Sequence, residues 1–425
     1  MMIEHKENSN FLQNTAGISI VEFFWGMGLP LVLESTFLQL FLKDLGATSF
    51  MIAFVPGIAF ASQALFGLVS AYWTKPLARK RPAVIKFHLY PALAILLFGL
   101  FLLLSNGEHS STLAVFFILY SVFSIGIGMT LPVWQNYFVK LFKPAQLLPA
   151  VAIMMIAQSA GRLICSFFIA DYFHSRSITP SNSALLFIFC GLLFFFGSFA
   201  FLLTKEEESK ADTQIDRQGF GSFIRQAFKS TLGDKNLMLF LLSDIELYAV
   251  IAVMSFYANY AVVYHNISPA AAAGFFVGFN YAGQITTNII FGSFNLFQLK
   301  TKCVISRICS IGAVILLVTG TGLPVFLGAS VLLGFSKAIR SLIYAPAVKI
   351  ISGASDTTSI FAAASIILLP LSMGISLLSG KLLDTLSFLT ADSYRIVFGI
   401  MGLLSFISIF FIIRIDFTRR SSTGV

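Results

Sequence analysis

Charged residues are scarce in this 425-residue chain, of which only 11% are Asp, Glu, Lys or Arg. Soluble domains carry about 25%. Hydrophobic residues make up 57% of the chain. No soluble core buries so much apolar surface, so the lipid bilayer must form part of the solvent of this protein. The composition therefore excludes a soluble enzyme or binding module.

Cysteine and histidine are also few, with four and five copies. None of them lies at metal-ligand spacing, and the chain contains no HExxH, GxSxG or GxxxxGK[ST] motif. We therefore expect no metal, no cofactor, no catalytic site and no ATP-driven pump. The net charge of +9 comes with basic residues in short loops rather than along a groove, so nucleic acid is not an expected partner.

Long apolar runs fill most of the chain, and a membrane-spanning helix needs about 20 such residues. They predict an all-α membrane protein of about twelve transmembrane helices. The expected spans are 15–41, 49–73, 83–104, 112–139, 149–172, 183–204, 236–264, 269–296, 303–321, 324–349, 357–383 and 393–414.

A charged linker divides these spans into two sets of six. We expect an N-terminal six-helix bundle over 1–204, a cytoplasmic linker over 205–235 and a C-terminal six-helix bundle over 236–425. Apolar linker residues recur at helical spacing and predict an amphipathic helix on the inner leaflet, namely Phe220, Phe223, Ile224, Ala227 and Phe228. Two such sets are typical of transporters built from repeats.

Lys and Arg gather in the loops on one side, which predicts that side to be cytoplasmic. These residues are Lys75, Arg79, Lys80, Arg81, Lys140, Lys143, Lys300, Lys302, Lys349, Arg419 and Arg420. The opposite loops hold little beyond Lys43, Arg176 and Arg395. We expect a monomer in the cell (inner) membrane with both termini in the cytoplasm.

The loop between spans two and three contains Gly67 and, after it, the basic run Arg79, Lys80 and Arg81. With the layout of six spans, linker and six spans, it resembles the major facilitator superfamily. The resemblance implies two bundles around a central cavity lined by spans one, four, seven and ten. It also implies that Gly67 and the basic run form a cytoplasmic gating loop. The acid usual in that loop is absent, and Ala71 stands in its place.

Seven ionisable residues at depth in the expected spans are candidates, because each such group costs about 2.5–3.5 kcal/mol to insert and needs a reason. They are Glu22, Glu34, Arg162, Asp244, Glu246, Lys337 and Arg340. All except Arg162 fall on spans one, seven and ten, which the resemblance places around the cavity. They are our first candidates for a site that binds a substrate or a coupling ion.

Asp244 and Glu246 lie at a depth similar to that of Arg340. Two positions apart on a helix, the two acids point about 200° apart and cannot face one partner. We expect Glu246 to face Arg340, with Lys337 on the same face of span ten as Arg340. Such a pair is either a static lock between helices or part of a substrate or gating site.

The remaining charges also have two interpretations. Glu22 and Glu34 either carry a coupled proton or pack near an interface. Arg162 either ties helices together or binds an anion. Further polar and aromatic candidates, most of which we expect to pack between helices, are Trp25, Trp134, Gln135, Tyr257, Asn280, Gln284 and Tyr344.

These observations favour a secondary transporter that moves a small organic solute, anionic or zwitterionic, by alternating access and coupled to protons. Its partners would be the solute, the bilayer and protons. The alternative is a membrane sensor or scaffold that retains the transporter fold without transport, and the missing loop acid is the observation in its favour.

Overall fold

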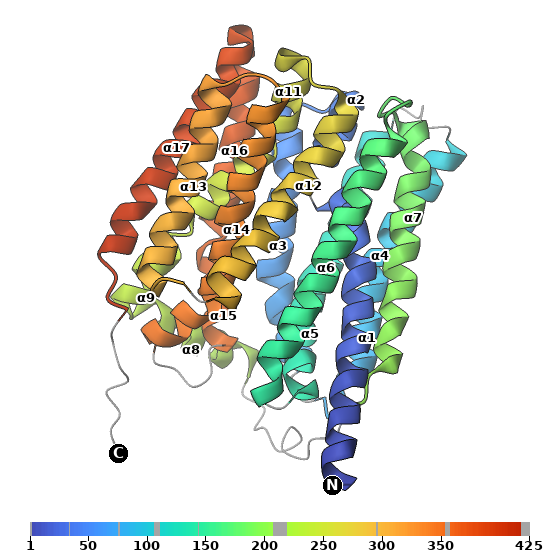
Figure 1. The fold of residues 1–425 in the computed structure, drawn as a ribbon, viewed down its shortest axis with the longest axis vertical. Coiled ribbons are helices and arrows are strands. Elements are labelled where there is room, and N and C mark those ends of the chain that lie inside the picture. The colour runs from blue at the N-terminus through green and yellow to red at the C-terminus, as the bar shows by residue number, and fades with distance from the viewer. Residues whose placement is uncertain are drawn as a thin grey trace. The chain divides into compact units, whose positions relative to one another are not determined.

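The computed structural model describes residues 2–33, 35–74, 77–105, 111–142, 144–206, 219–294, 296–352 and 358–417. Over these residues the chain forms helices and no strand (Figure 1). The first half comprises α1 (Met2–Val32), α2 (Ser35–Asp44), α3 (Ser49–Thr74), α4 (Arg81–Leu104), α5 (Thr112–Leu141), α6 (Pro144–Tyr172), α7 (Pro180–Phe199) and the 3-10 helix η1 (Ala200–Leu203).

The second half begins with α8 (Phe220–Leu232), a helix at the position where the sequence predicts an amphipathic one. The other helices are α9 (Lys235–Leu242), α10 (Ile245–Met254), α11 (Tyr257–His265), α12 (Pro269–Thr287), the π-helix η3 (Asn288–Ser293), α13 (Leu299–Thr319), α14 (Leu323–Ser352), α15 (Thr358–Ile367), α16 (Leu369–Thr385), the 3-10 helix η4 (Ser387–Leu389) and α17 (Ala391–Ile413).

Within the described residues, 11 helical segments are long and apolar enough to cross a membrane. The twelfth expected span, 269–296, corresponds to α12 and η3, and α12 is a helix of 19 residues. The prediction of an all-helical, multi-pass membrane protein with about twelve spans is therefore confirmed. Span seven differs from the expected single helix because α9, α10 and α11 divide it.

Several helices begin where the local sequence satisfies their free backbone N–H groups. Thr179 caps α7 by accepting a hydrogen bond from the Asn182 backbone, and Ser268 caps α12 in the same way through Ala271. A proline follows each cap at the first helical position, where its missing N–H costs nothing. These pairs explain why both helices begin where they do.

Contacts between residues group the chain into two units. Unit 1 holds Met1–Gly46 and Ala61–Arg217, and unit 2 holds Ala47–Phe60 and Gln218–Val425. Helix α3 is continuous across this division, so its first part groups with unit 2 and its remainder with unit 1. The domain boundaries expected at 204 and 236 stay predictions.

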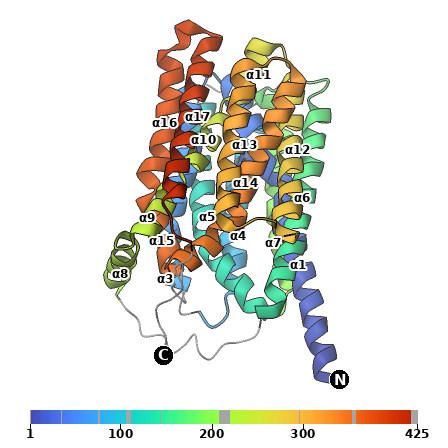
Figure 2. The same cartoon turned by 60° about the vertical axis from the view of Figure 1, so that its left-hand side comes forward.

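Both units pair their helices in the same order. In unit 1 the first span packs on the fifth through α1 and α6, and the third on the sixth through α4 and α7. In unit 2 the first span packs on the fifth through α10 and α16, and the third on the sixth through α13 and α17. The neighbouring courses of α13 and α17 can be followed in Figures 1 and 2. This shared order is what two repeats of one six-helix bundle produce.

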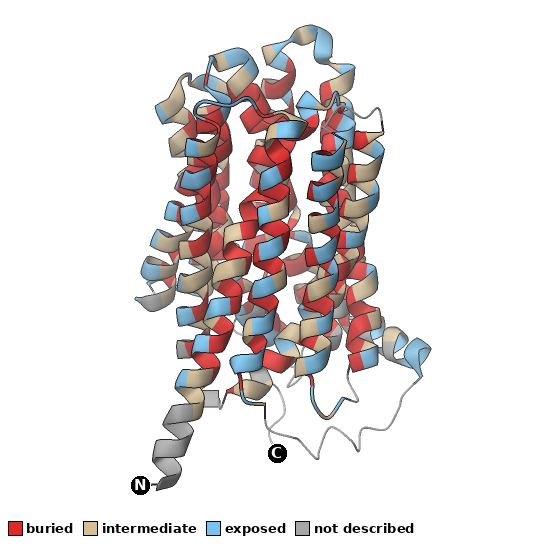
Figure 3. Cartoon of the chain, turned by 90° about the vertical axis from the view of Figure 1, so that its right-hand side faces the viewer, coloured by how far each residue is buried: buried red, intermediate tan, exposed pale blue. Residues whose placement is uncertain are grey.

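Small residues allow some of these pairs to approach closely. A Cβ added at Gly161 of α6 would collide with the backbone of Phe23 in α1, and one added at Gly334 of α14 would collide with the backbone of Asn280 in α12. Buried side chains follow the contact faces of the helices, and exposed apolar residues cover the remaining faces (Figure 3). That pattern is expected of helices whose outer faces meet lipid rather than water.

Candidate functional site

Span seven is interrupted where its acidic residues lie. Ser243 and Asp244 form a turn between α9 and α10, and a second turn at Ser255 and Phe256 precedes α11. At both turns a serine hydroxyl bonds back to a carbonyl: Ser243 to that of Phe240, and Ser255 to that of Ile251. Such bonds compete with the helical ladder and bend a helix. The first turn sets the directions of Asp244 and of the residues after it.

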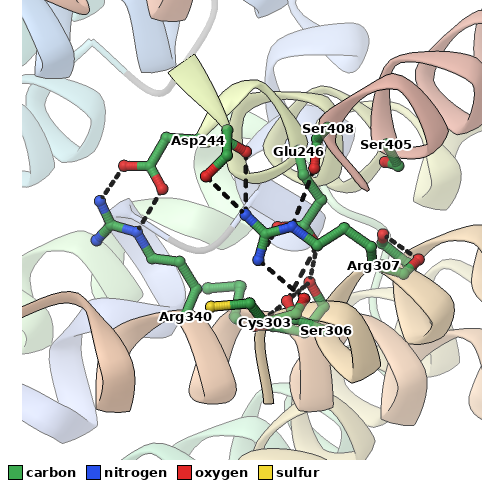
Figure 4. A network of polar contacts seen from close by, with 12 residues as sticks. Asp244, Glu246, Cys303, Ser306, Arg307, Arg340, Ser405 and Ser408 are labelled. Carbon is green, nitrogen blue, oxygen red and sulfur yellow. Dashed lines mark hydrogen bonds and ion pairs between the residues drawn. The ribbon is translucent and has the colours of Figure 1, made fainter. Parts of the chain in front are cut away.

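Asp244 forms an ion pair with Arg340 of α14 (Figure 4). The Nε atom of Arg340 lies 3.2 Å from Oδ1 of Asp244, and Nη2 lies 2.6 Å from Oδ2. Two parallel charge-assisted hydrogen bonds fix both side chains. The arginine side chain is 21% exposed, and its Cζ lies 3.8 Å from the centre of the Tyr344 ring. Arg340 is therefore oriented by Asp244 and Tyr344 but not enclosed.

The expected pairing of Glu246 with Arg340 is wrong, because Asp244 takes that arginine. The prediction treated span seven as one straight helix. Asp244 instead lies in the turn before α10, while Glu246 lies in its first turn and faces α13 and α14. The expectation that the two acids face different partners is confirmed, since Glu246 pairs with Arg307.

Glu246 lies in a closed, fully buried cluster. Its Oε1 accepts hydrogen bonds from the hydroxyls of Ser306 and Ser336, and its Oε2 lies 4.0 Å from Nη1 of Arg307. The glutamate side chain is 0% exposed and that of Arg307 is 2% exposed. The hydrogen bonds of this carboxylate are all on Oε1, and Oε2 has the Arg307 guanidinium as its charged neighbour without a hydrogen bond.

Arg307 uses all three guanidinium nitrogens on protein atoms. Its Nε donates to the Ser408 hydroxyl at 2.9 Å, Nη1 to the Cys303 carbonyl at 3.1 Å, and Nη2 to the Ser243 carbonyl at 3.0 Å. The Ser243 carbonyl is at the first turn in span seven, so Arg307 joins α13 to that turn and to α17 (Figure 4). Arg307 is not among the residues predicted from the sequence, although an arginine inside the expected span 303–321 was a sufficient signal.

Lys337 and Tyr344 lie on α14 on either side of Arg340, and both are half-buried. Tyr344 contacts the guanidinium, as described above. The structure therefore brings Asp244, Arg340 and Tyr344 together, with Lys337 one turn away on the same helix.

The other candidates of unit 2 form a polar group between helices. The Tyr257 hydroxyl lies 3.3 Å from that of Ser330, Asn280 donates to the Ser330 carbonyl at 3.1 Å, and Gln284 donates to Asn280 at 2.7 Å. Tyr257 and Asn280 are buried. Their contacts match the packing interpretation, since hydrogen bonds between spans hold helices together.

In unit 1, Glu22 of α1 is buried against α6. Its Oε2 accepts a hydrogen bond from the Gln158 amide, and Arg162 interacts electrostatically with the same carboxylate. The structure thus brings Glu22 and Arg162 together at one helix pair. Glu34, the other acid of span one, lies outside the described residues.

The tryptophan candidates differ in burial. Trp25 is buried, stacks on Phe194 with ring centres 4.2 Å apart, and donates from Nε1 to Ser198 at 3.4 Å. Trp25 therefore packs in the interior of unit 1. Trp134 of α5 is half-buried and stacks on Phe138, and the adjacent Gln135 is exposed.

An acid that was not predicted for the expected gating loop binds to it. Glu206, which follows η1, accepts hydrogen bonds from the backbone N–H groups of Lys80 and Arg81 at 2.7 and 2.9 Å. Its Oε1 also lies 3.5 Å from Nζ of Lys140. Glu206 thus caps the first turn of α4, where a negative charge is favoured. Ala71 is buried in α3, so the loop acquires its acid from a distant segment.

The basic side chains of this loop bond to unit 1 itself. Lys80 donates from Nζ to the Thr74 carbonyl, and Arg81 donates to the Thr204 carbonyl. Arg79 is exposed, and a Cβ added at Gly67 of α3 would meet Pro132 of α5 at an ordinary contact distance. Glu206 thus supplies a carboxylate to this loop, although not at the position that Ala71 occupies.

The fold and these membrane-embedded charges define a transporter. The chain matches the model of the Major Facilitator Superfamily over residues 16–367 and belongs to that family. This membership indicates a protein of transmembrane transport rather than an enzyme. No protein of curated function matches the chain in sequence.

Solved structures agree on the fold. A mutant of the nucleoside transporter NupG is 14% identical with a TM-score of 0.73, and the match covers 94% of this chain and 99% of that one. A bacterial homologue of the human lysosomal transporter Spinster, inward-facing and occupied, is 14% identical with a TM-score of 0.64 over 97% and 98% of the two chains. A POT family transporter in complex with 5-aminolevulinic acid is 12% identical with a TM-score of 0.69 over 95% and 96%.

Proposed function

We propose that this transporter is a secondary active one that moves a small anionic or zwitterionic organic solute by alternating access. The proposal rests on Arg340, the arginine that pairs with Asp244. Its side chain is partly exposed, and Asp244 does not bind all of its guanidinium nitrogens. Asp244 takes two of its three guanidinium nitrogens. Tyr344 is a further partner of the guanidinium, and the exposed part of the arginine would meet a carboxylate or phosphate with directional hydrogen bonds.

The surroundings of Arg340 suit a small organic molecule. The ring of Tyr344 supports the guanidinium and supplies an aromatic wall, and Lys337 adds a second positive charge on the same helix. Pockets for organic ligands combine apolar and aromatic walls with a few fixed polar groups. The similarity of fold to transporters of nucleosides and peptides is consistent with a solute of this size.

Proton coupling is the second part of the proposal, and Glu22 is its described candidate. The carboxyl group is buried, is held by Gln158 and has Arg162 as its basic neighbour. A buried carboxyl beside an arginine changes its proton occupancy when that arginine is engaged elsewhere. Glu34 stays the other candidate of span one. We also propose a monomer in the cell membrane with both termini in the cytoplasm, from the Lys/Arg bias of the loops.

The test begins with a thermal-shift panel of nucleosides, short peptides, amino acids and organic carboxylates on the purified protein, because a bound solute raises apparent stability. Hits are then tested for uptake into proteoliposomes with and without an imposed pH gradient. In Arg340→Lys we expect the apparent affinity to fall at least about tenfold, since lysine cannot reproduce the bidentate geometry. In Glu22→Gln we expect the pH gradient to lose its effect while solute binding remains.

The control is Arg176→Lys, because Arg176 also stacks on a tyrosine, Tyr172, but is exposed in a loop. The double variant Asp244→Asn with Arg340→Gln removes both charges together and so avoids a buried unpaired acid. If that double variant binds an anionic hit as tightly as the Arg176→Lys control, Arg340 does not bind the solute and this part of the proposal is lost.

A further inference from the structure

The first turn of α3 is held by an acid more than three hundred residues away in the chain. Oδ1 of Asp384, in the last turn of α16, accepts a hydrogen bond from the Ser49 backbone at 2.8 Å, and Oδ2 accepts one from Phe50 at 2.9 Å. Both helix segments belong to unit 2. A carboxylate at a helix N-terminus satisfies free N–H groups and meets the positive end of the helix dipole.

The remaining N–H groups of this turn are satisfied locally. Met51 donates to the Thr48 side chain at 3.2 Å, and Ile52 donates to the Thr48 carbonyl. All four N–H groups at the start of α3 therefore have acceptors, and two of the four depend on Asp384. Without that acid, two donors at this helix end lose a charged acceptor, and the one at Ser49 is partly buried.

Gly380 makes the contact between the two helices possible. It precedes Asp384 by four residues and so lies on the same face of α16. A Cβ added at Gly380 would lie 2.7 Å from Cβ of Ala53 and 2.8 Å from Cα of Phe50, closer than real contacts allow. At Gly374 of the same helix, an added Cβ would meet nothing within 4 Å. The two helices also meet at Gly57, where an added Cβ would lie 3.5 Å from Met373, but the tighter approach is at Gly380.

Helix α3 makes this contact consequential, because it continues into unit 1. Beyond Phe60 it packs in that unit, where Ser70 donates to the Met129 carbonyl of α5. The hydrogen bonds that hold the start of α3 on α16 therefore hold span two on span eleven. The start of α3 follows the loop of Lys43, on the side that the Lys/Arg bias predicts to face outwards.

We propose that Asp384 and Gly380 form an outer latch, in which the carboxylate holds the N-terminus of α3 when the outer side is closed and releases it when that side opens. This inference rests on the alternating access proposed above. The latch differs from the loop acid described for Glu206, since it acts at the opposite end of α3 and from unit 2. It makes Asp384 a positioning residue that sets the ratio of closed to open states, without contact to the solute.

The test measures that ratio by double electron–electron resonance, which gives the distance between two spin labels. Nitroxide labels are attached at Met51→Cys and Thr385→Cys, in a protein whose four native cysteines are replaced by serine. In Asp384→Asn we expect the population with the longer label distance to grow at least about tenfold relative to the short one, because a charge-assisted hydrogen bond is lost. Gly380→Ala should shift the ratio in the same direction by steric separation.

Two matched variants serve as controls. Asp392→Asn changes an exposed acid that pairs with Arg395, and Gly374→Ala adds a methyl group to open space. Both should keep the distribution of the parent protein. If Asp384→Asn or Gly380→Ala gives the same distribution as its control, the latch is refuted; if Asp384→Asn does not fold, Gly380→Ala alone decides. The readout needs no solute, so a failure of the transport assays leaves this result standing.

Discussion

Two arginine–carboxylate pairs meet at one turn of span seven, and they differ in how much of each arginine the protein itself uses. Arg307 gives all its nitrogens to protein acceptors and is 2% exposed, whereas Arg340 gives two of them to Asp244 and is 21% exposed. Both pairs join an arginine to a carboxylate, from Glu246 in one and Asp244 in the other, and their surroundings differ. We call the Arg307–Glu246 pair sealed and the Arg340–Asp244 pair open. The sealed pair braces the helix, and the open pair is the one at which we propose that the solute binds.

The geometry of the acids follows the same division. Glu246 lies 4.0 Å from its arginine and depends on serine hydroxyls, while Asp244 binds its arginine with two short hydrogen bonds. A buried pair adds little net stability over apolar residues, but removing one partner leaves an uncompensated charge in a low-dielectric interior. The sealed pair should therefore matter more for folding, and the open pair more for solute affinity.

Arg307→Ala should produce the largest loss of stability, about 3–5 kcal/mol in the free energy of unfolding, because Glu246 would stay buried without a counter-charge. Arg340→Ala should cost less, about 1–3 kcal/mol, since losing this partly exposed side chain opens a path for water to Asp244, which is otherwise buried. Unfolding by SDS titration in detergent micelles, followed by circular dichroism, measures both. Equal losses for the two variants would show that the sealed and open pairs do not differ in this way.

Substitution by lysine sharpens the comparison while keeping the charge. Arg307→Lys should cost about 2–3 kcal/mol, because one ammonium group cannot reach acceptors on Ser408, Cys303 and Ser243 together. Arg340→Lys should cost about 1 kcal/mol, since a single strong contact to Asp244 remains possible. The same SDS titration gives both values, and a smaller cost at Arg307 than at Arg340 would contradict the bracing role.

Most of the fold could be predicted from the sequence, but only part of the site. Hydrophobic runs of about 20 residues are enough to count spans, because the thickness of the bilayer sets their length. The depth of Asp244, Glu246 and Arg340 also follows from position within a span. The pairing does not follow, because it depends on a turn at Ser243 that the apolar pattern does not reveal.

Arg307 and Glu206 show two further limits. Arg307 could be predicted from the sequence, since any arginine in a span needs a reason, but it lies outside the spans that the resemblance places around the cavity. Glu206 lies far in the sequence from the loop that it caps. Contacts of that kind depend on the tertiary fold, and a single sequence contains no periodicity that predicts them.

The smallest effect on the free energy of unfolding should come from a third pair, which extends the comparison to exposed side chains. Asp392 and Arg395 lie one turn apart on α17, 2.9 Å from each other, with side chains 63% and 42% exposed. Asp392→Asn should change the free energy of unfolding by at most about 0.5 kcal/mol, because water and salt screen such pairs. The difference should shrink further in 1 M salt, whereas that of Arg307→Ala should persist, since its charges are out of reach of ions. A loss at Asp392 as large as that at Arg340 would mean that exposure does not decide what these pairs contribute, and the contrast between the sealed and the open pair would need another cause.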